Sequence, residues 1–216
     1  MTRHFRRTAA AAILPVLALL PLAACDGLFG PAPGGEGPIT SLPRSLTDGE
    51  ERIIEASNRF GFDLLARLHS EEPDENHFIS PLSGSMALGM AMNGADGGTF
   101  EAMRSTLGFT DSDLAAVNES YGGLIELLRG LDPRVELLLA NSVWLQEEWP
   151  FLAAYRDRVT GAFDADVENV DLRDPATADA INGWVSEGTN GKIEELVTPE
   201  MIRDLVALLA NTVYFE

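Results

Sequence analysis

The sequence contains a single cysteine, Cys25, in 216 residues, so no disulfide can form within the chain. It has only 3 histidines, and no two of them have the spacing of an HExxH metal site. A CxxC pair is likewise missing. These shortages give no support to a metal site or to a bound cofactor, and we expect neither.

Basic residues are also scarce, because 15 lysines and arginines stand against 34 aspartates and glutamates, for a net charge of -19. Such a surface repels the phosphates of nucleic acid and the anionic headgroups of lipids. The charge therefore excludes nucleic acid as a partner and membrane attachment by charge alone. The rest of the composition, 45% hydrophobic and 23% charged, is typical of one soluble domain with a buried hydrophobic core.

The apolar run near the start, Ala9 to Leu20, is short and interrupted by Pro15, which disfavours a spanning helix. It follows three arginines and precedes small residues, as a secretory signal does. Leu22-Ala23-Ala24-Cys25 resembles the lipobox of bacterial lipoproteins, which implies cleavage before Cys25 and lipidation of that residue. The alternative is an ordinary secretory signal with a chance cysteine. We expect an exported protein, lipid-anchored to a bacterial membrane in the periplasm or at the cell surface, or otherwise secreted.

The domain organisation follows from composition. Residues 1–24 are the expected signal peptide. Residues 25–45 are rich in glycine and proline, cannot bury enough surface to fold, and are expected to form a tether. Residues 46–216 then form the folded part.

Apolar periodicity and capping residues predict a series of helices in the folded part. Thr47 and Glu50 have the spacing of a capping box, and Ser80 precedes a proline in a first turn. Thr99 and Asp174 are further expected caps. The predicted helices cover residues 47–68, 81–92, 99–107, 114–131, 151–163 and a stretch from 175 onward. Short strands are predicted at 76–79 and 166–172.

Two further segments are nearly the same: LLANSVWLQ, Leu138 to Gln146, and LLANTVYFE, Leu208 to Glu216. Each lies in a stretch, 135–146 and 205–215, that is apolar on both alternating faces, as a doubly buried strand is. Helical crossovers join parallel strands, so we expect both segments as central strands of one sheet. Their asparagines, Asn141 and Asn211, need hydrogen-bond partners because an unpaired buried amide costs about 1–3 kcal/mol. A local backbone group is one option for that partner.

Several stretches in order resemble the serpin family. They are Asn76-His77-Phe78-Ile79-Ser80-Pro81-Leu82-Ser83, Asn93-Gly94-Ala95 with Gly98-Thr99 and Met103 to Gly108, Ala140 to Trp144, Ile181-Asn182 to Ile193, and Leu208 to Phe215. The resemblance implies an α+β fold with N-terminal helices packed on a large central sheet. It also implies an inhibitor of a serine or cysteine protease. In that mechanism the protease cleaves an exposed reactive loop, which then inserts into the sheet as a new strand.

The resemblance carries over to particular residues. Ser80, Ser83 and Asn211 match the shutter region that holds the sheet closed until insertion. Thr189, Gly191 and Lys192 match the end of a helix that crosses the sheet and must yield. Local roles are the alternatives: Ser80 as a helix cap, Ser83 as a first-turn hydroxyl, and Gly191 as a C-terminal cap.

The resemblance covers roughly the first half of the family's domain, without the later strands, the shutter histidine or the reactive loop. We therefore expect an incomplete reading frame or a fragment whose last strand exposes an unpaired edge and associates with peptides or other chains. A non-inhibitory serpin-like binding module is the alternative. An enzyme is not expected, because a Ser–His–acid site would need His69 or His77, and neither is near a G-x-S-x-G turn.

Overall fold

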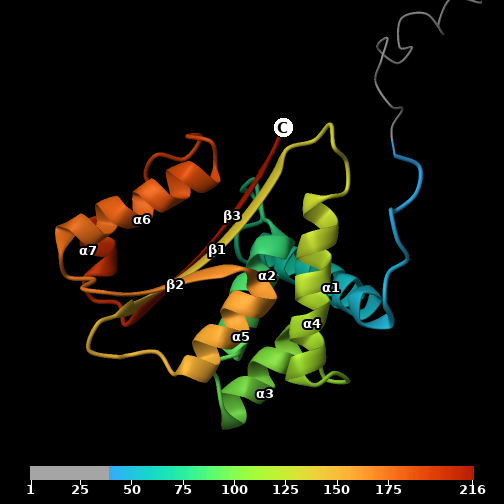
Figure 1. The fold of residues 1–216 in the computed structure, drawn as a ribbon, viewed down its shortest axis with the longest axis horizontal. Coiled ribbons are helices and arrows are strands. Elements are labelled where there is room, and N and C mark those ends of the chain that lie inside the picture. The colour runs from blue at the N-terminus through green and yellow to red at the C-terminus, as the bar shows by residue number, and fades with distance from the viewer. Residues whose placement is uncertain (1–38) are drawn as a thin grey trace, which may run out of the picture. The chain divides into compact units, whose positions relative to one another are not determined.

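The computed structural model describes residues 39–216, so Cys25, the expected signal peptide and most of the expected tether lie outside it. One compact unit extends from Ser41 to Glu216. Within the described residues, no helix is both long and apolar enough to cross a bilayer. The elements, in order, are α1 (Asp48–Glu71), α2 (Pro81–Met92), α3 (Gly97–Thr106), α4 (Leu114–Arg129), β1 (Leu137–Gln146), α5 (Ala153–Phe163), β2 (Ala165–Val170), α6 (Pro175–Gly188), α7 (Pro199–Ile202) and β3 (Ala207–Phe215) (Figure 1).

Three of the four predicted caps are confirmed. Thr47 and Glu50 form the full capping box of α1, Ser80 caps α2, and Asp174 caps α6. The prediction for Thr99 is wrong, because Asp96 caps α3 by accepting a 2.8 Å hydrogen bond from the Gly97 N–H. The upstream carboxylate starts the helix earlier, which places Thr99 inside the first turn.

The short strand predicted at 76–79 is not present. A strand exists only through backbone pairing with a neighbour, and residues 39–216 supply no such neighbour to this segment. Phe78 in the middle of it is 100% exposed. Residues 76–79 therefore lie in a connection between α1 and α2 that pairs with no strand.

The repeated segments do share one sheet, as predicted, and its strand order is β2-β1-β3. β1 and β2 are parallel, as expected for strands joined by the α5 crossover. β1 and β3 are antiparallel, which contradicts the expected parallel arrangement. Among the described strands only β1 is central, while β3 lies at an edge (Figure 1).

The antiparallel arrangement arises from a return path after α6. The end of α6 lies near the start of β1, where the Asn190 amide donates to Glu136. The chain then runs back along α6, and Asn182 holds it there: its side-chain oxygen accepts from the backbone N–H groups of Leu196 and Val197 at 2.8 and 3.0 Å. The chain therefore enters β3 at the end where β1 finishes, which forces β3 to run in the opposite direction.

The core lies on both faces of the sheet. On one face α1, α2, α4 and α5 enclose the larger cluster, in which Phe163 and Tyr121 have ring centroids 4.9 Å apart. Gly89 of α2 is needed there, since a Cβ at this position would lie 3.0 Å from the Phe163 ring. On the other face α6 and α7 cover the smaller cluster, built from Trp144, Leu172, Ala178, Ile181, Val197 and Ile202.

Candidate functional site

The two repeated asparagines face each other across the sheet, because Asn141 of β1 is the register partner of Asn211 of β3. The Asn211 amide donates to the Asn141 side-chain oxygen at 2.8 Å, and the Asn141 amide donates to the Phe163 carbonyl at 2.7 Å. The expectation that each asparagine has a partner is thus confirmed. Asn141 is held both by a side chain across the sheet and by a backbone carbonyl at the end of α5.

The repeat has a physical explanation in this pairing. With the asparagine pair at the centre, Ala140 lies opposite Thr212 and Ser142 lies opposite Ala210. Further out, leucine and valine are paired on both sides, as Leu139 with Val213 and Val143 with Leu209. The two segments therefore form a local two-fold arrangement, in which similar sequences run in opposite directions and place small residues opposite hydroxyls.

One polar atom of the Asn141–Asn211 pair is not satisfied by the pairing. The Asn211 side-chain oxygen is buried and has no hydrogen-bond partner among the described residues. The amide nitrogen of the same side chain is directed at β1 and lies 3.7 Å from the Met86 sulfur on α2. A buried amide oxygen without a partner is costly, which marks Asn211 as a position suited to a further contact.

Ser80 and Ser83 lie at the start of α2. The Ser83 N–H donates to the Ser80 hydroxyl at 3.3 Å, and the two hydroxyl oxygens are 2.8 Å apart. The local role for Ser80, a helix cap, is therefore present. No hydrogen bond within residues 39–216 joins either serine to Asn211; the α2 residue in contact with that amide is Met86, one turn beyond Ser83. A shutter role for the three residues stays a prediction.

The predicted sheet-crossing helix end contains a tight cap. Thr189 is 3% exposed, donates from its hydroxyl to the Val185 carbonyl at 2.8 Å, and accepts from the Ile193 N–H at 3.1 Å. Gly191 has a φ of 72°, which favours glycine, and its N–H donates to the Ser186 carbonyl at 2.8 Å. Lys192 is exposed. The local capping role of Gly191 is thus present, and the movement implied by the resemblance stays a prediction.

Gly188, which the sequence did not single out, sets how closely α6 approaches the sheet. A Cβ at Gly188 would lie 2.7 Å from the Thr212 hydroxyl and 3.6 Å from the Ala140 side chain. The end of α6 therefore lies directly on the asparagine pair's neighbours, Ala140 in β1 and Thr212 in β3. The only sequence signal was a glycine in the last turn of a predicted helix.

We expect Gly188→Ala to destabilise the fold by about 1 kcal/mol, because the added methyl group must displace Thr212 or the helix end. Gly183→Ala is the matched control on the same helix, since a Cβ at Gly183 meets nothing within 4 Å. That control should be neutral or should stabilise by up to about 1 kcal/mol through helix propensity. Urea unfolding of both variants tests this, and equal stabilisation of the two would contradict the close contact.

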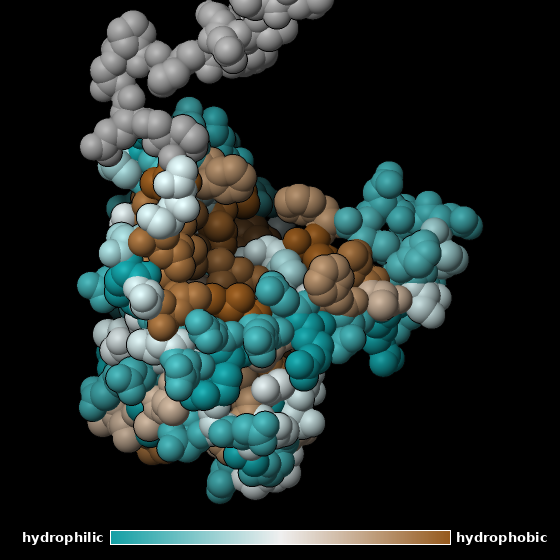
Figure 2. Space-filling view, turned by 90° about the vertical axis from the view of Figure 1, so that its right-hand side faces the viewer, coloured by the Kyte–Doolittle hydropathy of each residue, from teal (hydrophilic) through white to brown (hydrophobic). Residues whose placement is uncertain are grey.

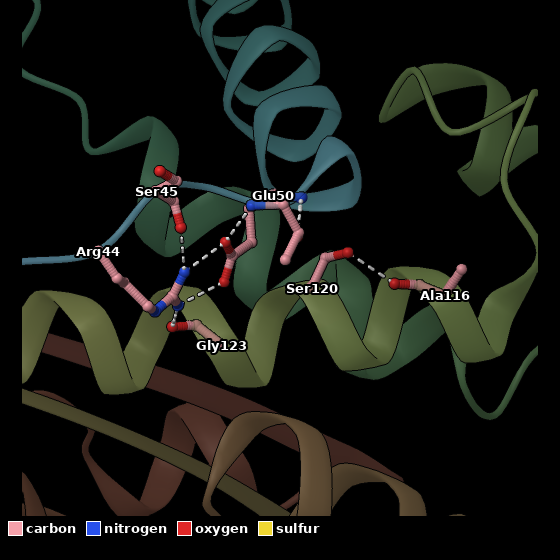
Figure 3. Close-up of polar contacts among 7 residues, drawn as sticks. Arg44, Ser45, Glu50, Ala116, Ser120 and Gly123 are labelled. Carbon is pink, nitrogen blue, oxygen red and sulfur yellow. Dashed lines mark hydrogen bonds and ion pairs between the residues drawn. The ribbon is translucent and has the colours of Figure 1, made fainter.

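A second unforeseen feature is the ion pair between Arg44 and Glu50, which fixes the entry into α1 (Figure 3). The guanidinium donates to both carboxylate oxygens of Glu50 at 2.6 and 2.7 Å and to the Gly123 carbonyl of α4 at 3.0 Å. Glu50 is 2% exposed and also accepts from the Thr47 N–H at 2.8 Å. The capping box predicted this position of Glu50, but nothing in the glycine- and proline-rich segment predicted that Arg44 would bind it.

The hydrogen bond from Arg44 lowers the pKa of Glu50 to about 2, and the Thr47 N–H adds to the effect. Because the folded-state pKa is depressed, this stabilisation is complete above the usual value of 4.5 and is lost as the pH falls toward 2. We expect Glu50→Gln to lower the free energy of unfolding at neutral pH by about 2 kcal/mol and to flatten its decline below about pH 5. Glu55→Gln, an exposed change on the same helix, is the control. Equal acid sensitivity of wild type and Glu50→Gln would contradict the ion pair's role.

One concave surface of the described residues is mainly apolar. Figure 2 looks onto the side that carries α1 and α4 and shows hydrophobic surface gathered in a hollow. A cavity of about 250 Å³ between α1, α2 and α4 is lined mainly by leucines and isoleucines, and Met86 and Tyr121 also line it. Within residues 39–216, no cluster of histidine, cysteine or acidic side chains has the arrangement of a metal site.

The two histidines considered for an acid–base role lie together. The rings of His69 and His77 meet edge to face with centroids 6.2 Å apart, near the end of α1. A ring nitrogen of His77 is 2.9 Å from the Glu72 carbonyl oxygen. These contacts stabilise the turn after α1.

The fold and this site define an α+β protein in which helices cover both faces of a mixed sheet and an asparagine pair joins its two antiparallel strands. The family model described as Serpin (serine protease inhibitor) matches residues 55–216. The chain belongs to the serpin family.

Individual relatives agree with this assignment. The chain is 36% identical over 171 residues to Iripin-2 of Ixodes ricinus, covering 77% of this chain and 43% of that protein. It is 33% identical over 157 residues to Serine protease inhibitor 42Dd of Drosophila melanogaster, covering 72% of this chain and 41% of that protein. Human thyroxine-binding globulin, solved in complex with thyroxine, has a TM-score of 0.66 and 28% identity over 78% of this chain and 46% of that one. The chain thus spans less than half the length of these relatives.

Proposed function

We propose that this chain is the N-terminal portion of a serpin-type inhibitor of a serine or cysteine protease. The observation that carries the proposal is the match of residues 55–216 to the family model described as Serpin (serine protease inhibitor). In an inhibitor of this type, a reactive loop cleaved by its target would add as a new strand at the edge of β3. The family description and the Drosophila relative's name as a serine protease inhibitor support protease inhibition as the function.

The proposal gives roles to the residues around that edge. Asn211, beside the edge, would hold the sheet closed together with Ser80 and Ser83, and its unpartnered oxygen would receive a further donor in the complete domain. The α6 end at Thr189, Gly191 and Lys192 would yield as the sheet opens. The close contact of Gly188 with Thr212 supports this, because movement in β3 must displace the end of α6.

The test uses the full reading frame that contains this chain, incubated with a panel of serine and cysteine proteases. An inhibitor of this type gives a covalent one-to-one complex that survives denaturing electrophoresis, since the protease stays acyl-linked to the inserted loop. Cleavage of the protein by every protease without any such complex would overturn the proposal. Heating provides a second readout, because loop insertion raises the unfolding temperature of the cleaved form.

A non-inhibitory binding module is the second candidate function. It is favoured by the likeness to thyroxine-binding globulin, a protein of the same fold solved in complex with thyroxine. In that case the cleaved protein would show neither a protease complex nor a rise in unfolding temperature.

We further propose that the protein is exported and is lipid-anchored to a bacterial membrane through Cys25. The support is the basic, apolar and small-residue layout of residues 1–25 with the sole cysteine at the expected cleavage site. Fatty-acid labelling of wild type and Cys25→Ser in a bacterial host tests it. Label and membrane pelleting should be present in the wild type and lost in the variant; an unlabelled, freely secreted wild type would overturn the anchor.

A further inference from the structure

Three asparagines of the chain are followed by glycine: Asn93, Asn182 and Asn190. Loss of the side-chain amide is fastest in such a pair, because glycine has no side chain to hinder attack by its own backbone nitrogen. The reaction needs an asparagine side chain that can turn onto the next nitrogen, and a nitrogen released from its hydrogen bond. The contacts of the three side chains therefore decide which of them can react.

Two of these side chains are held firmly. Asn93 is 2% exposed and uses both ends of its amide in reciprocal hydrogen bonds with Asn118, of 2.8 and 2.9 Å. Asn182 lies within α6 and binds the segment that returns after this helix through both its amide nitrogen and its oxygen. Turning either side chain onto the following nitrogen would break these bonds.

Asn190 is held less firmly. It follows α6 with a φ of 50°, a left-handed conformation that asparagine tolerates, and it is exposed among the described residues. Its amide donates over a long 3.4 Å to a carboxylate oxygen of Glu136 and also interacts with the Tyr214 hydroxyl. The Gly191 N–H is bound to the Ser186 carbonyl at 2.8 Å, so attack must wait until the last turn opens. Helix ends open at low free energy, so this bond delays the reaction without preventing it.

We propose that Asn190 is a site of spontaneous deamidation at the end of α6. The Gly191 nitrogen gives its proton to solvent and attacks the side-chain carbonyl carbon of Asn190, so that a carbon–nitrogen bond forms. The bond from that carbon to the side-chain nitrogen breaks, and the nitrogen leaves as ammonia with a proton from solvent. Water then opens the five-membered imide at one of its two carbonyls, which gives aspartate or isoaspartate.

The product changes how the end of α6 is held. A carboxylate at position 190 replaces a hydrogen-bond donor beside Glu136, so attraction becomes repulsion between like charges. Isoaspartate also adds a CH₂ group to the main chain between Thr189 and Gly191, inside the cap that these residues form with Val185 and Ser186. The modified helix end should therefore open more often. The deamidation does not rest on the proposed inhibitory function, although it acts at the helix end that this function would require to yield.

Ageing of the complete protein tests the site. The full reading frame that contains this chain is incubated in warm, mildly alkaline buffer, and peptide mapping by mass spectrometry follows each asparagine. Asn190 should react at least about tenfold faster than Asn93 or Asn182, because each of those must first break several hydrogen bonds. The rate should rise with pH, since the Gly191 nitrogen must lose its proton. Comparable rates at the three positions, or an unmodified Asn190, would overturn the proposal.

Two controls separate the structural cause from the local sequence and identify the route. In denaturing urea the three rates should converge, because each asparagine is followed by glycine; a difference that persists in urea would contradict the role of the contacts. Enzymatic methylation of isoaspartate should label position 190, and aspartate without isoaspartate would contradict the imide. Asn190→Gln is the matched variant: its amide can still donate to Glu136, but it must close a six-membered ring, so it should stay unmodified over the same period.

The consequence for α6 has a separate test. Asn190→Asp introduces the charge directly, so hydrogen exchange of the backbone amides in residues 186–193 should be about threefold faster than in the wild type. Asn190→Asp with Glu136→Gln removes the repulsion and should restore the wild-type exchange rate. Equal exchange in the wild type and Asn190→Asp would contradict the effect on the helix end.

Discussion

Phe163→Ala is expected to lower the free energy of unfolding by about 4 kcal/mol, the cost of removing a large aromatic from a packed core. Phe163 is 0% exposed, its ring packs on Tyr121, and Gly89 of α2 lies against it. The ring thus joins α2, α4 and α5 at one point. Because the helices cannot close fully over the space, the variant keeps a cavity as well as losing apolar contact.

Urea denaturation followed by circular dichroism measures this change, with Phe62→Ala as the control. Phe62 is also a phenylalanine but is 74% exposed on α1, so its replacement should change the free energy of unfolding by less than about 0.5 kcal/mol. Similar losses in the two variants would mean that Phe163 is not the centre of the helical layer.

Asn141→Ala is expected to cost about 3 kcal/mol. The substitution removes two hydrogen bonds, of 2.7 and 2.8 Å, and leaves the Phe163 carbonyl and one hydrogen of the Asn211 amide unpaired in a buried place. Each buried group left without a partner carries a desolvation penalty of about 1–3 kcal/mol. Unfolding of the purified variant in urea measures the loss.

A double-mutant cycle with Asn211→Ala separates the pair from its surroundings. The two amides are in direct contact, so the coupling between the substitutions should be about 1 kcal/mol. Purely additive costs would contradict a direct interaction between the strands at this pair. A change confined to Asn141→Ala would instead assign the whole effect to the Phe163 carbonyl.

Local signals in the sequence predicted what depends on local contacts. Ser80 and Asp174 were found as caps because a cap needs only a hydroxyl or carboxylate a few residues from its N–H. The direction of β3 depended instead on the Asn182 hydrogen bonds to a returning segment, and no spacing rule contains that path. A rule for helical crossovers therefore gave the right sheet and the wrong orientation.

For the candidate site, too, the sequence predicted what depends on local patterns and missed the contacts between distant residues. Repetition of the Leu-Leu-Ala-Asn pattern was enough to expect two buried asparagines in one sheet, since similar surroundings require similar residues. That they would bind each other depended on the antiparallel register, which was missed. The roles of Gly188 and Arg44 were missed for a related reason: each acts on a partner distant in sequence, Thr212 for one and Gly123 of α4 for the other.

The Arg44 ion pair has a mechanical consequence. Any pull that reaches the domain along the chain from its N-terminal side arrives at Arg44 before it arrives at α1. Two charge-assisted hydrogen bonds to Glu50 and one to Gly123 then share that load. In single-molecule force spectroscopy with tension from that side, we expect the Arg44 contacts to break first, while α1 is still helical.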